Sequence, residues 1–161
     1  MGVITYDMEI PSSIPAPKMF KAFVLEGDTL LPKILPQAVK SVETLEGDGG
    51  AGTIKLITFG QGSVHKCVKH RVDAINKENF TYSYSVVGGD ALADEFESIA
   101  YHMEIVAGLD GGSVYKNRGV YNTKGDAQVT QERIKSVKEK ASSIFKAVEV
   151  YLLANPDAYH S

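Results

Sequence analysis

Residues 130–156 read TQERIKSVKEKASSIFKAVEVYLLANP, and apolar side chains recur in this stretch at steps of three and four. The recurring positions are Ile134, Val137, Ala141, Ile144, Phe145, Val148 and Leu152. This spacing predicts a helix of about 24 residues, roughly 36 Å long, with one continuous apolar stripe. Thr130 is suited to cap its start, and Asn155-Pro156 is expected to end it. A helix with a single apolar stripe requires a second layer to pack against.

The second layer is predicted to be an antiparallel sheet, because the residues before the helix alternate in polarity. One segment places on a common face Phe80, Tyr82, Tyr84 and Val86, and the next places together Glu97, Ile99, Tyr101, Met103 and Ile105. Further strands are expected over Val3–Ile10, Val39–Leu45, Thr53–Phe59, Lys66–Ala74 and Ser113–Tyr121. Glycine-rich turns separate several of these segments, which favours a meander.

Two short helices are expected between the first two strands. Pro15 and Pro17 suit the start of a helix over Met19–Leu25, and Asp28 is suited to cap a second helix that ends near Pro36. The elements together predict an α+β fold of one domain spanning residues 1–161.

A curved sheet around one helix about 10 Å across leaves a concavity that the helix does not fill. The polar side chains expected on its lining are Lys55, His70, Tyr82, Tyr84 and Tyr101, and the expected apolar walls are Phe23, Phe59 and Phe145. Polar tips in an apolar concavity are typical of a site for amphipathic ligands.

Composition excludes several other classes of protein. Lys and Arg number 17 against 20 Asp and Glu, so the net charge of −3 does not provide the basic surface of a nucleic-acid binder. The N-terminal stretch contains Asp7 and Glu9 and lacks the pattern of a secretory signal, and no run of about 20 apolar residues is present. The single cysteine, Cys67, has no intrachain partner. We therefore expect a soluble cytoplasmic protein with no membrane partner.

Seven segments carry a resemblance to a known family. They are residues 14–28, 31–43, 45–59, 82–92, 106–113, 121–127 and 147–159, and they include LEGDGGAGTIKLITF, YSYSVVGGDAL and AVEVYLLANPDAY. In these segments the sequence resembles the plant pathogenesis-related class 10 proteins, the family of the major birch-pollen allergen and its fruit homologues. The resemblance implies a seven-stranded curved antiparallel sheet gripping a long C-terminal helix, with two short helices and a large internal cavity.

The resemblance also implies a function. Family members bind flavonoids, cytokinins, brassinosteroids and fatty acids, and the family ligand contacts match Lys55, Tyr82, Tyr84 and Tyr101 by position. Tyr101 stands where the birch allergen has Asn, and Cys67 stands where it has Tyr, so ligand identity does not carry over. We expect an intracellular carrier of small amphipathic molecules in plant defence or secondary metabolism, a potential allergen, monomeric or weakly dimeric, and without a cofactor.

Three other sites are weighed against this function. The loop Gly47–Gly52 lacks the lysine spacing and the following helix of a P-loop, so a tight hairpin turn is expected there. Strand alternation places His65 and Cys67 on one face and His70 on the other, which leaves at most two ligands for a metal. No metal site is therefore expected. His70 is instead predicted to be a hydrogen-bonding group of the cavity.

Enzymatic and signalling functions remain as alternatives. The family has been described as containing ribonucleases, with candidate residues that match Glu97, Glu149 and Tyr151. Glu97 is predicted on the apolar face of its strand, but Glu149 and Tyr151 lie about 200° apart around a helix. A biosynthetic catalyst of the kind found among distant relatives has no independently assembled acid–base set here. A hormone-sensing regulator of a phosphatase would need a gate-loop motif that is absent from residues 88–92.

Overall fold

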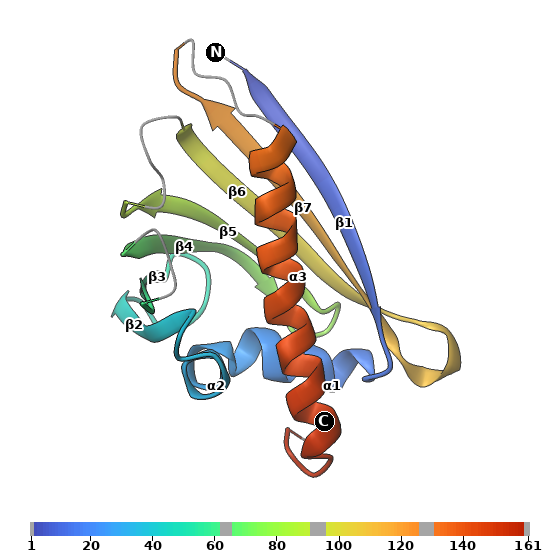
Figure 1. The fold of residues 1–161 in the computed structure, drawn as a ribbon. Helices are drawn as coiled ribbons and strands as arrows, with labels where there is room; N and C mark the ends of the chain where they lie inside the picture. Colours follow the sequence, from blue (N-terminus) through green and yellow to red (C-terminus); the bar gives the residue numbers. More distant parts are fainter. Residues whose placement is uncertain (1, 62–65, 91–95, 126–130, 160–161) are drawn as a thin grey trace.

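The computed structural model describes residues 2–61, 66–90, 96–125 and 131–159 (Figure 1). The strands are β1 (Val3–Ser12), β2 (Val39–Glu46), β3 (Ile54–Phe59), β4 (Cys67–Asn76), β5 (Thr81–Gly88), β6 (Phe96–Ala107) and β7 (Ser113–Thr123). The helices are α1 (Ala16–Phe20), α2 (Gly27–Ile34) and α3 (Gln131–Ala154), with a π-helical turn η1 (Lys21–Leu25) and a 3-10 turn η2 (Leu109–Gly111). The predicted α+β fold is confirmed, and each predicted strand end lies within two residues of the observed one.

The strands form one antiparallel sheet in the order β1-β7-β6-β5-β4-β3-β2. Strands β2 to β7 follow one another as a meander, whereas β1 pairs with β7 at the opposite edge from β2. The sheet curves around α3, and α1 and α2 lie across one end of the concave face (Figure 1). None of the described helices combines the length and the apolar character needed to cross a membrane.

The two short helices differ in detail from their prediction. The first begins at Ala16, with Pro17 in its opening turn, and passes directly from α1 into η1. Asp28 does not cap α2, because the cap position is Glu26 and Asp28 lies within the first turn. The side chain of Asp28 instead forms an ion pair with Lys55. The predicted cap of α3, Thr130, lies outside the described residues.

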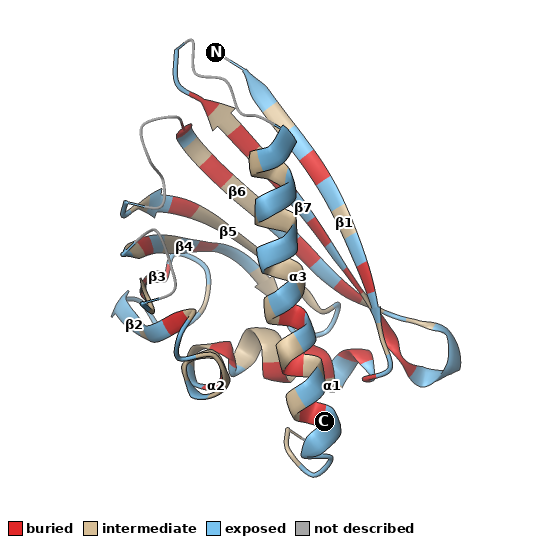
Figure 2. Ribbon diagram, in the orientation of Figure 1, coloured by how far each residue is buried: buried red, intermediate tan, exposed pale blue. Residues whose placement is uncertain are grey.

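The apolar stripe of α3 is fully buried only in the second half of the helix (Figure 2). Its buried residues are Phe145, Val148 and Leu152, which pack with α1, α2 and the adjoining ends of β6 and β7. The earlier stripe residues Ile134, Val137, Ala141 and Ile144 are only partly buried. The first half of the helix therefore spans the concave face of the sheet without filling the space beneath it.

A glycine permits the close packing of β1 on β7. Gly119 pairs with Tyr6, and a β-carbon at position 119 would overlap the edge of the Tyr6 ring. It would also come within 3.1 Å of the Tyr121 ring, which stacks on Tyr6 at a centroid distance of 5.7 Å. Tyr6 is 5% exposed, so its ring has little room to move aside. Gly119 thus lets a tyrosine ring lie flat across the neighbouring strand.

Gly119→Ala is expected to lower the free energy of unfolding by about 1–3 kcal/mol, since the added methyl group overpacks two buried rings. Denaturant unfolding of the variant and the wild type measures this difference. Gly27→Ala is the matched control, because a β-carbon at position 27 meets no atom within 4 Å. Equal stability of Gly119→Ala and the wild type would contradict this account of the β1–β7 packing.

Candidate functional site

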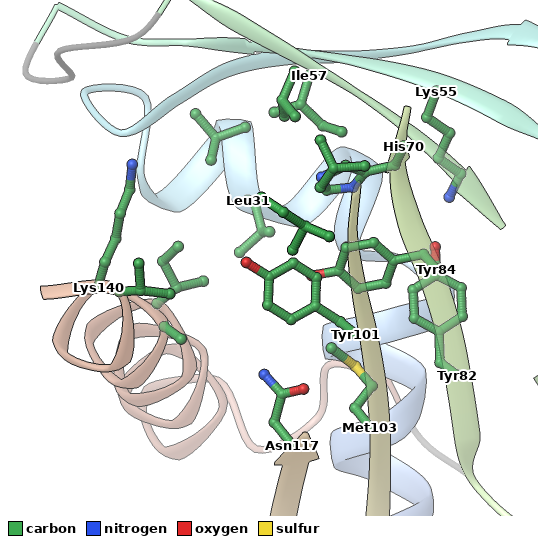
Figure 3. A pocket seen from close by; sticks show the side chains of 18 of the residues that line it. Leu31, Lys55, Ile57, His70, Tyr82, Tyr84, Tyr101, Met103, Asn117 and Lys140 are labelled. Carbon is green, nitrogen blue, oxygen red and sulfur yellow. The ribbon is translucent and has the colours of Figure 1, made fainter. Parts of the chain in front are cut away.

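A pocket of about 360 Å³ lies between the first half of α3 and the concave face of the sheet (Figure 3). The partly buried stripe residues of α3 form one wall, and the inward faces of β1 to β7 form most of the other. Seven of the eight predicted ligand-binding residues line it: Phe23, Lys55, Phe59, His70, Tyr82, Tyr84 and Tyr101. The alternation of the strands thus located most of the site.

Phe145, the eighth predicted residue, does not line the pocket. Its side chain is fully buried and stacks on Tyr115 at a centroid distance of 4.8 Å, with Phe23 at 5.5 Å. These rings close the end of the pocket from behind because α3 approaches the sheet at this level. Phe145 is therefore a core residue, and its placement in the lining was wrong.

A row of rings crosses the floor of the pocket from β4 to β6 (Figure 3). The Tyr84 ring lies 4.4 Å from His70, 5.1 Å from Tyr101 and 5.4 Å from Tyr82, measured between centroids. The register explains the row, because Tyr84 pairs directly with Tyr101 on β6. Burial raises the pKa of Tyr82 to about 12 and that of Tyr84 well above its ordinary value. These phenols are therefore neutral and can donate hydrogen bonds.

Six of the eight tyrosines of the chain line the pocket, and sequence analysis identified only three of them. The others are Tyr6, Tyr115 and Tyr121, and the hydroxyls of Tyr101 and Tyr121 are hydrogen-bonded at 2.9 Å. The alternation within residues 113–121 could have revealed Tyr115 and Tyr121, because every second residue of β7 faces inward.

Lys55 reaches the pocket from β3 and is paired there with an acid. Its Nζ lies 2.9 Å from Oδ2 of Asp28, and its side chain is 14% exposed. The ion pair connects α2 to the sheet and neutralises Lys55 at the pocket wall. The prediction that Lys55 faces the cavity agrees with the structure, and its partner was missed because Asp28 was interpreted as a helix cap.

His70 is held neutral by its surroundings. Burial, and to a lesser extent the nearby charge of Lys55, lowers the pKa of His70 to about 4. Lys55 pairs directly with His70 across β3 and β4, so its ammonium opposes a second positive charge. At neutral pH the imidazole therefore offers the pocket one donor and one acceptor.

Two buried polar atoms of the pocket form no hydrogen bond of ordinary length among the described residues, although the phenols of Tyr121 and Tyr115 lie near them. They are the hydroxyl of Tyr6 and Oδ1 of Asn117, and each residue is 5% exposed. Both residues line the pocket. A buried polar group without a hydrogen bond costs roughly 1–3 kcal/mol, so the fold bears an energetic cost at these two atoms.

The three residues of the ribonuclease alternative do not converge. Glu97 is exposed because a bulge at the start of β6 pairs Phe96 with Thr123 and Ser98 with Asn122, which turns Glu97 outward. Its predicted position on the apolar face was therefore wrong. Phe96 contacts Arg133 near the start of α3, whereas Glu149 lies roughly 24 Å further along that helix at 1.5 Å per residue.

The other two residues of this set have structural partners. Glu149 is paired with Lys146 at 3.4 Å, and the Tyr151 hydroxyl accepts a hydrogen bond from Lys33 at 3.1 Å. Two further predicted sites lie partly outside the described residues. In the His65–Cys67–His70 group this residue is His65, and in the gate-loop segment 88–92 the residues are Ala91 and Leu92.

The comparisons with known proteins agree with this architecture. The model of one protein family, described as the pathogenesis-related protein Bet v 1 family, matches residues 1–155. The chain is 57% identical over 160 residues to major allergen Pru ar 1 of Prunus armeniaca, covering 99% of this chain and 100% of the relative. It is 58% identical over 159 residues to major strawberry allergen Fra a 1.04 of Fragaria ananassa, covering 99% of each chain.

Solved structures show the same fold. The crystal structure of Ara h 8.0201 matches with a TM-score of 0.84 at 40% identity, covering 95% of this chain and 99% of that one. Norcoclaurine synthase from Thalictrum flavum, solved with dopamine and hydroxybenzaldehyde, matches with a TM-score of 0.73 at 21% identity, covering 95% and 88%. The second likeness shows the fold alone. The family profile and the close relatives both cover nearly the whole length, and the chain therefore belongs to the pathogenesis-related protein Bet v 1 family.

Proposed function

We propose that this protein binds small amphipathic molecules in the pocket beneath α3. The observation that carries the proposal is an apolar, aromatic cavity that contains buried polar atoms without partners. A site selected only for stability would favour aliphatic residues there, because each buried hydroxyl or amide needs a hydrogen bond. An amphipathic ligand supplies both the apolar surface and the missing hydrogen-bonding groups.

The dimensions of the pocket set the affinity that we expect. Burying about 300 Å² of apolar ligand surface at about 25 cal/mol/Å² contributes about 7 kcal/mol. Ordering the ligand and the side chains offsets several kcal/mol of this free energy. Micromolar dissociation constants and broad specificity follow, and they suit a carrier better than a highly selective receptor.

The chemistry of the lining supports ligands of the flavonoid, cytokinin, brassinosteroid or fatty-acid type, as the family resemblance implies. Neutral phenols and a neutral imidazole suit hydroxyl and heterocyclic nitrogen groups. We infer that the protein carries such molecules in the cytoplasm, in plant defence or secondary metabolism. Relatives that are named as major allergens make this chain a candidate allergen as well.

A bulky residue in the pocket is expected to abolish binding. Val137 lies on the pocket wall of α3, and Val137→Trp would place an indole ring in the space that the ligand needs. We expect its affinity for the neutral dye Nile red to fall at least tenfold, measured by fluorescence titration. Quercetin, trans-zeatin, brassinolide and dodecanoic acid then serve as competitors, and at least one should displace the dye from the wild type at micromolar concentration.

Leu153→Trp is the matched control for this variant. Leu153 lies on the same helix, is 58% exposed and is not part of the pocket lining, so dye affinity should be unchanged. The natural chain has no tryptophan, so each variant carries a single indole whose emission reports its burial. Undiminished dye binding by a folded Val137→Trp would place the dye elsewhere, and failure of all four competitors would refute the proposed function.

The neutral state of His70 predicts a pH dependence of stability. Its pKa is about 4 in the folded protein and about 6.5 when unfolded, so the unfolded state binds the proton more readily. The contribution of His70 is therefore complete above pH 6.5 and is lost as the pH falls towards 4. Between pH 7.5 and pH 5 the wild type should lose roughly 2 kcal/mol through this residue.

Denaturant unfolding of wild type and His70→Leu at both pH values measures this loss. The decrease in unfolding free energy between pH 7.5 and pH 5 should be smaller for His70→Leu by roughly 2 kcal/mol. His102→Gln is the control, because His102 is exposed on the outer face of β6 and bonded to Ser83. It should keep the wild-type dependence. Identical pH dependence of all three proteins would show that His70 does not remain neutral on folding.

A further inference from the structure

The part of the pocket formed by β1 and β7 contains two buried polar atoms that form no hydrogen bond of ordinary length. Asn117 faces inward from β7 between Tyr115 and the position of Gly119, and its amide lies near the Tyr115 phenol. Its Oδ1 atom accepts no hydrogen bond of ordinary length among the described residues. Tyr6 faces inward from β1 opposite Gly119, and its hydroxyl lies near the Tyr121 phenol without a hydrogen bond of ordinary length. The two residues therefore belong to one face of two neighbouring strands, separated diagonally by one inward position.

The charged groups of the pocket lie on other elements. Asp28 comes from α2, Lys55 from β3, and Arg133 and Lys140 from α3. Figure 3 shows Asn117 well apart from the ammonium groups of both Lys55 and Lys140. Burial raises the pKa of Tyr6, so its hydroxyl stays protonated. The residues that β1 and β7 contribute to the pocket lining are thus neutral, and they lie beside Met103. The nearest cation is Lys138 of α3, whose Nζ lies 5.2 Å from the centroid of the Tyr6 ring and which is not part of the lining.

These two atoms determine which hydrogen-bonding groups a complementary ligand needs at this position. Asn117 Oδ1 requires a donor, and the Tyr6 O–H requires an acceptor. A carboxylate only accepts, so it would leave Asn117 Oδ1 without a donor. A hydroxyl both donates and accepts, and it suits the Asn117 amide in either orientation of its oxygen and nitrogen.

We propose that Asn117 and Tyr6 form a subsite for a neutral hydroxyl group, phenolic or alcoholic, on the bound ligand. This inference rests on the proposed function and specifies which end of the ligand lies against β1 and β7. The hydroxyl donates to Asn117 Oδ1 and accepts from the Tyr6 O–H, and the apolar body of the ligand extends beneath α3. The subsite selects hydroxylated molecules over analogues of the same shape that lack a donor.

A pair of probes that differ in one donor tests the subsite. 2-Naphthol and 2-methoxynaphthalene share a ring system, but only the naphthol donates a hydrogen bond. Isothermal titration calorimetry at pH 7 should give the wild type about tenfold higher affinity for 2-naphthol. In Asn117→Leu the ratio should fall to about one, while 2-methoxynaphthalene binds as it does to the wild type. Tyr6→Phe should weaken the binding of both probes and leave their ratio nearly unchanged, because the oxygen of each can accept from the Tyr6 O–H.

Asn122→Ala is the matched control, because Asn122 lies on the outer face of the same strand and bonds to Ser98. It should keep the tenfold preference. The thermal unfolding midpoint of Asn117→Leu without ligand should equal or exceed that of the wild type, since the change removes a buried unpaired amide. A lower midpoint, with the preference for naphthol retained, would show that Asn117 serves the fold and would overturn the proposal.

The remaining outcomes separate this inference from the proposed function. Equal binding of both probes by the wild type would refute the subsite and leave the proposed function intact. A preference that persists undiminished in Asn117→Leu would also refute the subsite. Absence of binding by both probes and by Nile red would refute the proposed function and the subsite together.

Discussion

The structure depends on the fit of one helix against a sheet that is wider than the helix can cover. Where α3 meets α1, α2 and the ends of β6 and β7, Phe145, Val148 and Leu152 close the core completely. Where it crosses the open part of the sheet, the same apolar stripe is only partly buried and a pocket remains. The core and the pocket thus lie along a single helix, with its second half in the core and its first half over the pocket.

The tyrosines supply both the apolar surface of the pocket and most of its polar atoms. A phenol contributes aromatic surface along its whole ring and presents one polar atom at its tip. Neighbouring tyrosines can also satisfy each other, as the Tyr101 and Tyr121 hydroxyls do at 2.9 Å. The pairing is incomplete at Tyr6, and Asn117 adds a second unpaired atom nearby. The pocket therefore combines one pair of phenols that satisfy each other with polar atoms that form no hydrogen bond of ordinary length.

Periodicity predicted the strands, the long helix and most of the lining, because a strand places every second side chain on one face. It failed where a bulge breaks the alternation of a strand, and where residues of one helix stripe are buried to different extents. The bulge at the start of β6 turned Glu97 outward and Phe96 inward, and no local pattern signals one extra residue. Phe145 and Val137 belong to the same apolar stripe, but Val137 lines the pocket and Phe145 is in the core. The difference arises because the Phe145 ring stacks on Tyr115, a contact that the stripe alone does not predict. The role of Asp28 was not predictable from its local sequence, because its ion-pair partner Lys55 lies on β3.

The sheet order has a consequence for biosynthesis. Strand β1 is synthesised before the other strands of the sheet, but its partner β7 begins at Ser113, about a hundred residues later. At about 5–20 residues per second, β1 waits roughly 5 to 20 seconds before it can pair. Its inward residues, Tyr6 among them, have no sheet to pack on during that interval. Nascent chains of this protein therefore have to keep the apolar face of β1 from associating with other chains until β7 has been synthesised.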